Sequence, residues 1–178
     1  MNIPAFTPFP KIPRLRRPIC ITEKIDGTNA SVMVLEDGRV LAGSRTRWIT
    51  PEADNYGFAR WVKDNEDELR KLGLGHHFGE WWGAGIQRRY GLTEKRFSLF
   101  NTDRWENGVP TSAVSVVPVL YRGNMEDSAI NAALDKLRAE GSIAAPGFMN
   151  PEGWSSSTTP RVQCTKSSWS MMSFQKDL

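Results

Sequence analysis

The chain has 178 residues, of which 39% are hydrophobic and 24% are charged. This is enough for one globular domain with a real core, and we expect no large appended domains. The net charge of +3 is compatible with a polyanionic partner but does not by itself indicate one.

The sequence carries no sign of a membrane protein or a secreted one. No apolar run is long enough to span a bilayer, and the proline-spaced N-terminus lacks the apolar core of a signal peptide. Cys20 and Cys164 have neither a metal-type nor a disulfide-type spacing. We therefore predict a cytoplasmic protein without a membrane partner.

The first elements in chain order are an extended arm and three strands. Residues 1–17 are rich in proline and end in a basic cluster, so we expect an arm over the surface. Strands are predicted over 18–24, 30–35 and 39–44. The last two are joined by Glu36-Asp37-Gly38, which is a strong hairpin signal.

Two helices and further strands follow. Thr50 and Pro51 have the residue types of a cap and a first helical position, and an apolar period then continues to Leu72, so we predict a scaffold helix that Gly73 ends. Further strands are predicted around Glu80, over 97–101 and over 115–121. A second amphipathic helix is predicted from a cap at Asn124 to Glu140, with Gly141 as its stop.

The string Glu23-Lys24-Ile25-Asp26-Gly27-Thr28-Asn29 is the strongest functional signal. It places a lysine at the end of a strand, beside a tight turn, where its side chain can be held in a groove. A lysine attacks only when it is deprotonated, which requires desolvation or nearby positive charge. The string resembles motif I of the covalent nucleotidyltransferases, and within that superfamily it is most similar to the RNA ligases.

Four later segments extend this resemblance. Arg45, after the hairpin, matches the arginine of motif Ia, which contacts the nucleotide. Glu80, in a Gly-Glu segment followed by aromatic residues and Gly-x-Gly-Ile-Gln, matches motif III. Phe100 matches the aromatic residue of motif IIIa that stacks on adenine, and Glu152 matches the carboxylate of motif IV that helps hold the metal.

The sequence departs from the family pattern after Gly153. An apolar strand and then a lysine-led strand are expected, but the chain continues with the polar residues 155–159. Lys166 falls near the expected phosphate-binding lysine, without apolar neighbours. Because a one-base shift would convert much of this segment into apolar residues, we predict that residues 154–178 are out of frame; a divergent or disordered tail is the alternative.

The resemblance implies an α+β fold, a ligase adenylation domain with an ATP-grasp-like nucleotide groove between antiparallel sheets. It divides the chain into the arm (1–17), a nucleotidyltransferase domain (18–153) and an atypical tail (154–178). The implied enzyme is an ATP-dependent RNA ligase that forms a lysyl-AMP intermediate on Lys24. Its implied cofactors are ATP and Mg²⁺, and its implied substrate is RNA with broken or nicked ends. The implied nucleotide-contacting residues are Glu23, Asn29, Arg45, Glu80, Phe100 and Lys166, with Glu152 as the metal ligand.

Other functions remain open at this point. One is a catalytically impaired homologue that binds ATP or RNA without sealing, because its last motif is missing. Another is a basic RNA-binding module without nucleotide chemistry, resting on Arg14, Arg16, Arg17, Arg88 and Arg89. Such a module would bind RNA with a salt-dependent affinity and ignore ATP. A DNA ligase or a capping enzyme is a related possibility within the nucleotidyltransferases.

Overall fold

The computed structural model of the protein describes residues 18–158. The predicted arm and residues 159–178, including Lys166, lie outside the described residues. The strands are β1 Pro18–Lys24, β2 Thr28–Val34, β3 Val40–Ser44, β4 Trp48–Ile49, β5 Gly75–Gly83, β6 Lys95–Leu99, β7 Ser115–Val116, β8 Val119–Asn124 and β9 Gly153–Thr158. The helices are α1 Phe58–Asp64, α2 Glu66–Arg70 and α3 Asp127–Glu140.

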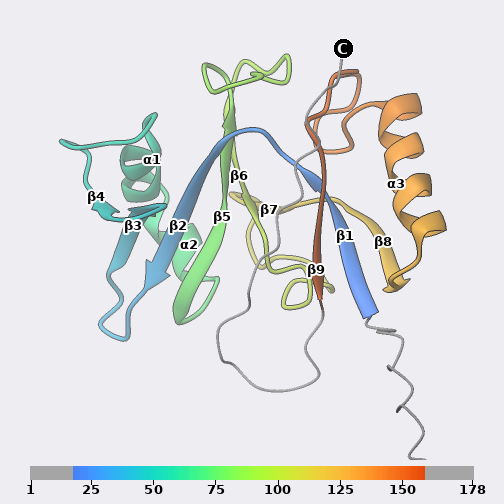
Figure 1. Ribbon diagram of the computed structural model, residues 1–178. Coiled ribbons are helices and arrows are strands. Elements are labelled where there is room, and N and C mark those ends of the chain that lie inside the picture. Colours follow the sequence, from blue (N-terminus) through green and yellow to red (C-terminus); the bar gives the residue numbers. More distant parts are fainter. Residues whose placement is uncertain (1–17, 159–178) are drawn as a thin grey trace, which may run out of the picture.

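The strands form two sheets with helices on their outer sides (Figure 1). One sheet has six strands in the order β4-β3-β2-β5-β6-β7, and the other has three in the order β8-β1-β9. All pairs are antiparallel except β6 and β7, which are parallel. This agrees with the predicted α+β arrangement of two sheets with outer helices, and corrects it at that one parallel pair.

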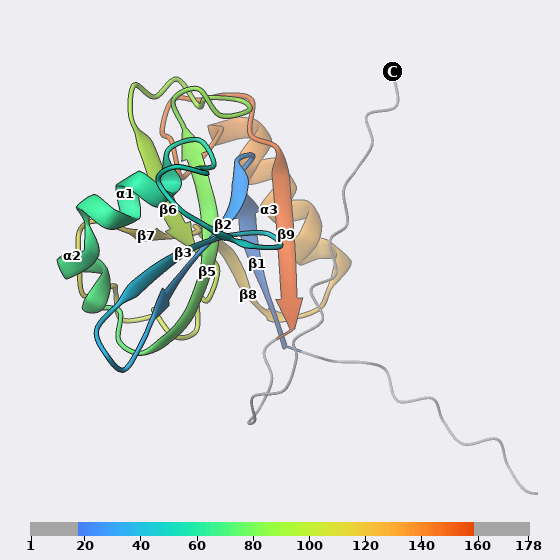
Figure 2. The same ribbon diagram turned by 90° about the vertical axis from the view of Figure 1, so that its left-hand side faces the viewer.

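Each sheet turns one face toward its own helices (Figure 2). Alternate residues of β2 and β5, such as Val32 and Trp81, are buried with Phe58 of α1 and Leu69 of α2. On β1, Ile19 and Ile21 pack with residues of α3. The opposite face of the six-stranded sheet carries the polar side chains of the candidate site described below.

The predicted scaffold helix begins later than expected and is interrupted. Residues 50–57 form turns and an isolated bridge between Thr50 and Ala53, and helix α1 starts only after Gly57, whose φ is 81°. The carboxylate of Asp54 accepts the backbone N–H groups of Ala59 (2.7 Å) and Arg60 (3.1 Å). Asp54 thereby satisfies the free donors of the first helical turn from outside the helix, which is the role that the sequence pattern assigned to Thr50. Asn65 then separates α1 from α2.

Two later boundaries also differ from the prediction. The strand predicted over 115–121 is two strands, β7 and β8, with Pro118 between them; proline has no N–H for a ladder bond. Asn124 belongs to β8 and does not cap α3, whose cap position is Glu126. The stop at Gly141 agrees with the structure, since this residue is the C-cap with a φ of 78°.

The expectation that no strand follows Gly153 is wrong for residues 153–158. Strand β9 pairs with β1 over six positions, from Ile19↔Thr158 to Lys24↔Gly153. The strand forms despite its serines because backbone groups make the ladder and Trp154 supplies a buried anchor, 8% exposed. The boundary predicted at Gly153 therefore falls at the start of a strand of the sheet.

No helix within residues 18–158 is both long enough and apolar enough to cross a membrane.

Candidate active site

Lys24 and Glu23 occupy opposite faces of β1, because successive side chains of a strand alternate. Glu23 is only 1% exposed, on the same face as the core residues Ile19 and Ile21. Its carboxylate accepts the hydroxyl of Ser142 (2.6 Å) and the backbone N–H groups of Ile143 and Ala144 (both 2.9 Å). This arrangement does not support the predicted nucleotide contact of Glu23 and gives it an internal structural role.

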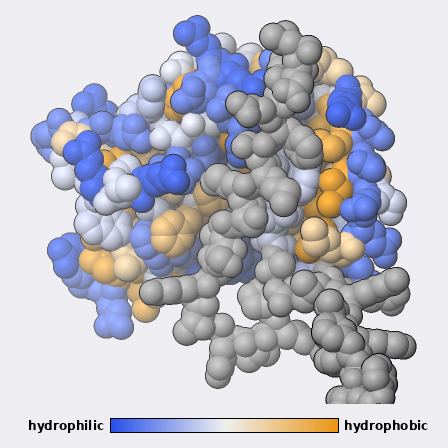
Figure 3. Space-filling model, in the orientation of Figure 1, coloured by the Kyte–Doolittle hydropathy of each residue, from blue (hydrophilic) through white to orange (hydrophobic). Residues whose placement is uncertain are grey.

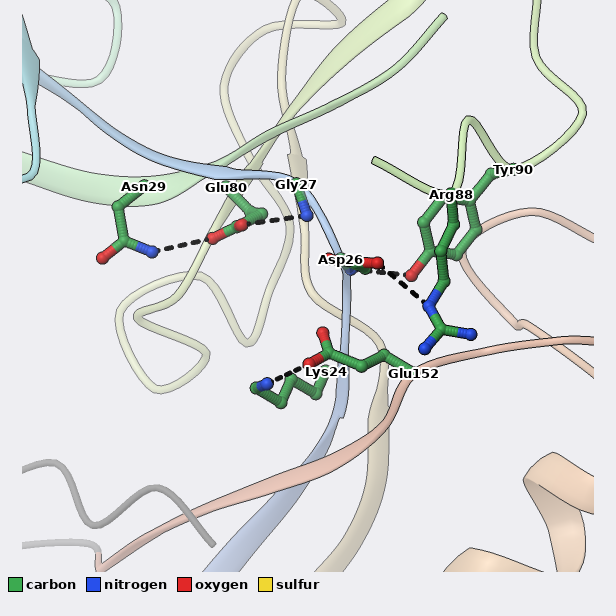
Figure 4. Close-up of polar contacts among 8 residues, drawn as sticks. All are labelled: Lys24, Asp26, Gly27, Asn29, Glu80, Arg88, Tyr90 and Glu152. Carbon is green, nitrogen blue, oxygen red and sulfur yellow. Dashed lines mark hydrogen bonds and ion pairs between the residues drawn. The ribbon is translucent and has the colours of Figure 1, made fainter. Parts of the chain in front are cut away.

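Lys24 lies on the other face of β1, in an ion pair with Glu152 (Figure 4). The two side chains are 24% and 25% exposed. Glu152 immediately precedes β9, and the pairing of Lys24 with Gly153 brings it to the lysine. The structure thus unites the predicted nucleophile with the predicted metal ligand.

Glu80 and Asn29 face each other across the β2–β5 pair. The carboxylate of Glu80 accepts the side-chain amide of Asn29 and the backbone N–H of Gly27, each at 3.1 Å. Burial raises the pKa of Glu80 to about 7, although both hydrogen bonds favour the ionised form. Gly27 is required here because a Cβ at this position would lie 2.5 Å from the carbonyl oxygen of Trp81 and 3.0 Å from Cγ of Glu80.

The loop after β5 holds the turn that follows Lys24. The guanidinium of Arg88 donates through Nε to Asp26 (2.9 Å) and through Nη1 to the carbonyl oxygen of Asn150 (3.2 Å). The hydroxyl of Tyr90 accepts the backbone N–H of Asp26 at 2.7 Å, and burial raises the pKa of Tyr90. The loop contains three non-glycine residues with positive φ, which are Gln87 (41°), Arg89 (58°) and Tyr90 (51°). Such backbone is costly and commonly occurs at functional sites.

Arg45 and Phe100 flank this centre on the six-stranded sheet. Arg45 is exposed and lies one residue beyond the last β2–β3 pair, Ala30↔Ser44, so it continues the row of Asn29 and Glu80. Phe100 follows β6 and is partly buried against the cluster that contains Ile25 and Trp82. Both residues are therefore near the elements that carry Lys24 and Glu80.

The residues between 18 and 158 contain no group of three or more His, Cys, Asp or Glu side chains that could hold a metal ion by themselves. A Mg²⁺ ion usually takes one or two carboxylates and completes its shell with water and substrate phosphates. Glu152 fits that pattern as a single, partly exposed carboxylate beside the lysine.

The comparisons with known proteins come to the same family as the motifs. A sequence model described as RNA ligase matches residues 17–157. The chain belongs to the RNA ligase family. A search of curated proteins finds no match for this RNA ligase family member.

Solved structures of a Naegleria gruberi RNA ligase have a fold similar to that of this chain. A lysine-to-alanine mutant without ligand has a TM-score of 0.56 at 19% identity, and a glutamate-to-alanine mutant with AMP and Mn has 0.56 at 18%. An arginine-to-alanine mutant with ATP and Mn has 0.52 at 18%. Each match covers 80% of this chain and 47% of the other, so this chain spans about half the length of those proteins.

Reasoning from the sequence missed three residues that the structure brings to the site, namely Asp26, Arg88 and Tyr90. Asp26 stands inside the lysine motif, so its position was a usable signal. Arg88 was considered only as part of a basic surface, yet it is partly buried with 31% of its side chain exposed. No local pattern links Arg88 to Asp26, which is 62 residues earlier in the chain.

Proposed function

We propose that this protein is an ATP-dependent RNA ligase with a nucleotidyltransferase fold, and that Lys24 is its nucleophile. The observation that carries the proposal is the position of Lys24 at the end of β1, paired with Glu152 and next to the Asp26–Gly27 turn that Glu80 holds. Membership in the RNA ligase family supports the reaction class.

The chemistry divides into three steps. Lys24 loses its proton, parts from Glu152, and attacks the α-phosphorus of ATP; a P–N bond forms and pyrophosphate leaves with the bonding electrons. A 5′-phosphate oxygen of RNA then attacks the same phosphorus, breaks the P–N bond, and frees the lysine. Finally a 3′-hydroxyl attacks the 5′-phosphorus and displaces AMP.

The other residues bind and orient the reactants. We assign Arg45 to the ribose or phosphates of ATP, Phe100 to its adenine, and the Glu80–Asn29 pair to its ribose hydroxyls. Glu152 would hold Mg²⁺, which neutralises phosphate charge when bound. Lys166 stays a predicted phosphate contact outside the described residues.

The test is to incubate the protein with ATP and magnesium and to map an AMP-sized mass gain by peptide mass spectrometry. We expect the adduct on the peptide with Lys24, and none in Lys24→Ala. Lys71→Ala is a matched control, because Lys71 also pairs with a carboxylate, Glu68, but at the exposed C-terminal end of helix α2. An adduct on a different lysine would refute the assignment, whereas ATP binding without any adduct would favour the impaired homologue.

Glu152→Ala should lower the rate of lysyl-adenylate formation by about a hundredfold or more while the protein stays folded. A reduced rate with unchanged thermal unfolding supports a role in the chemistry. Loss of the folded state would make Glu152 a structural residue.

A further inference from the structure

Three aromatic side chains lie together on the outer part of the six-stranded sheet. Trp48 of β4 and Phe78 of β5 are 51% and 54% exposed. The exposed His76 contacts the rings of both. The ring centroids of Trp48 and His76 are 5.3 Å apart, and those of His76 and Phe78 are 4.0 Å apart. We call these three residues the aromatic strip.

The strand register places the aromatic strip on the same face as Glu80 and Asn29. His76, Phe78 and Glu80 alternate along β5 with the buried residues His77 and Trp81, so they share the face away from α1 and α2. In Figure 3, apolar surface is exposed among hydrophilic surface over the β2–β5 part of the sheet.

The surrounding residues hold the aromatic strip in place. Trp48 pairs with Gly43. A Cβ on Gly43 would lie 2.5 Å from the hydroxyl of Ser31 and 3.2 Å from the indole ring of Trp48. The same hydroxyl is 2.9 Å from Nε2 of His76. The missing side chain at position 43 therefore lets the indole lie close to the sheet, and Ser31 fixes the imidazole beside it.

The aromatic strip continues toward the proposed adenine site. The backbone N–H of Phe100, just after β6, donates to the carbonyl oxygen of Phe78 at 2.9 Å, so these two residues are neighbours. At the other side, Arg45 and Arg47 are both exposed in the turn between β3 and β4. The face thus combines exposed rings with cations, and Phe78 lies two residues from Glu80 on the same face of β5.

We propose that the aromatic strip binds a single-stranded segment of the RNA substrate by stacking its bases on Trp48, His76 and Phe78. Exposed aromatic residues on a sheet face, with nearby arginines for the phosphates, are a recurrent way to bind single-stranded RNA. A purely apolar partner would gain nothing from the exposed Arg47, whereas RNA uses both the rings and this cation. This inference rests on the proposed function, because it assigns a surface to the substrate of that reaction.

The test measures the affinity for a short, fluorescently labelled oligouridylate by anisotropy. Trp48→Ala and Phe78→Ala should each weaken binding by about tenfold, the loss expected for one stacked base. Phe78→Tyr should bind like the unmodified protein, and Phe78→Leu should lose as much as Phe78→Ala. Met125→Ala is the matched control, because Met125 is 56% exposed but lies between β8 and α3.

An abasic oligomer of equal length and charge separates stacking from electrostatics. The proposal expects Trp48→Ala and Phe78→Ala to bind it as the unmodified protein does. It is overturned if the variants lose affinity equally for both oligomers, if they bind oligouridylate normally, or if Phe78→Leu retains full affinity. It is also overturned if the variants change only self-association, which would make the aromatic strip a contact between copies.

Lysyl-adenylate formation by the unmodified protein is measured in parallel, without RNA. Absence of the adduct refutes the proposed function, and the anisotropy series still decides whether the aromatic strip stacks bases. The two failures are therefore distinguishable. Thermal unfolding of each variant verifies that the fold is retained.

Discussion

At the scale of single residues, we expect Glu23 to contribute strongly to stability and its neighbour Lys24 to contribute little. Glu23→Ala would leave the buried hydroxyl of Ser142 and the partly buried N–H groups of Ile143 and Ala144 without their acceptor, so we expect the free energy of unfolding to fall by about 3 kcal/mol or more. Lys24→Ala should change it by less than about 1 kcal/mol, since only a partly exposed ion pair is lost. Urea denaturation of both variants is the measurement. A stable Glu23→Ala variant would contradict the structural role of this carboxylate.

The raised pKa of Glu80 predicts a pH dependence of stability. Its pKa is about 7 in the folded protein and 4.5 as the ordinary value, so the folded state binds the proton more tightly. The stability that the folded state gains from binding this proton is fully present below pH 4.5 and is lost as the pH rises through 7. Glu80→Gln removes this titration, so it should be more stable than the unmodified protein at pH 8, by at most about 3 kcal/mol.

The advantage of Glu80→Gln should shrink as the pH falls toward 4.5. Thermal unfolding over this pH range measures the difference. A difference that is independent of pH would show that Glu80 does not titrate as described.

At the scale of elements, the loop between β5 and β6 connects the two chain segments that carry the ion pair. Arg88 contacts Asp26, two residues after Lys24, and Asn150, two residues before Glu152. We expect Arg88→Ala to slow lysyl-adenylate formation by about tenfold with little change in the KM for ATP, because the guanidinium positions the lysine without touching the nucleotide. Single-turnover kinetics at several ATP concentrations measure both quantities.

A double-mutant cycle provides the control for this positioning role. If Arg88 and Asp26 act as one unit, then Arg88→Ala, Asp26→Ala and the double variant should all be slowed to a similar extent. Fully additive effects would show that the ion pair between Arg88 and Asp26 does not position the lysine.

The polar sequence of strand β9 leads to a prediction about stability. Ser156 pairs with Ile21 and shares the face of the buried Trp154, which packs with α3. Ser156→Val should therefore raise the free energy of unfolding by about 0.5–1 kcal/mol, because a branched apolar side chain suits this half-buried position. Chemical denaturation measures it, with Ser155→Val on the opposite face as the control. A loss of stability in Ser156→Val would contradict the assigned face.

The sequence was a good guide where local patterns decide the structure. Strand β1, the hairpin near Gly38 and the end of α3 at Gly141 depend on alternation and turn residues that are close in the chain. The start of α1 was missed because its first donors are satisfied by Asp54 from the preceding loop. The interior position of Glu23 was missed because its partners lie 119 to 121 residues later.

At the scale of the whole molecule, the reading frame after Gly153 stays a prediction. Backbone pairing forms β9 with the present sequence, so the strand alone does not decide between the two frames. We expect that moving the frame by one base after the Gly153 codon gives a more soluble protein with more lysyl-adenylate. Equal solubility and equal adduct from the two proteins would show that residues 154–178 are native.

The central position of β1 also has a consequence for how the protein folds during synthesis. Both of its partners, β8 and β9, come late in the chain, and the ion pair of Lys24 spans 128 residues. A ribosome adds residues at about 5–20 per second, so β1 leaves it many seconds before it can be hydrogen-bonded on either side. The six-stranded sheet, built mostly from consecutive strands, can assemble first. The lysine therefore meets its carboxylate only after nearly all of the described residues have been synthesised, in one of the last events of folding.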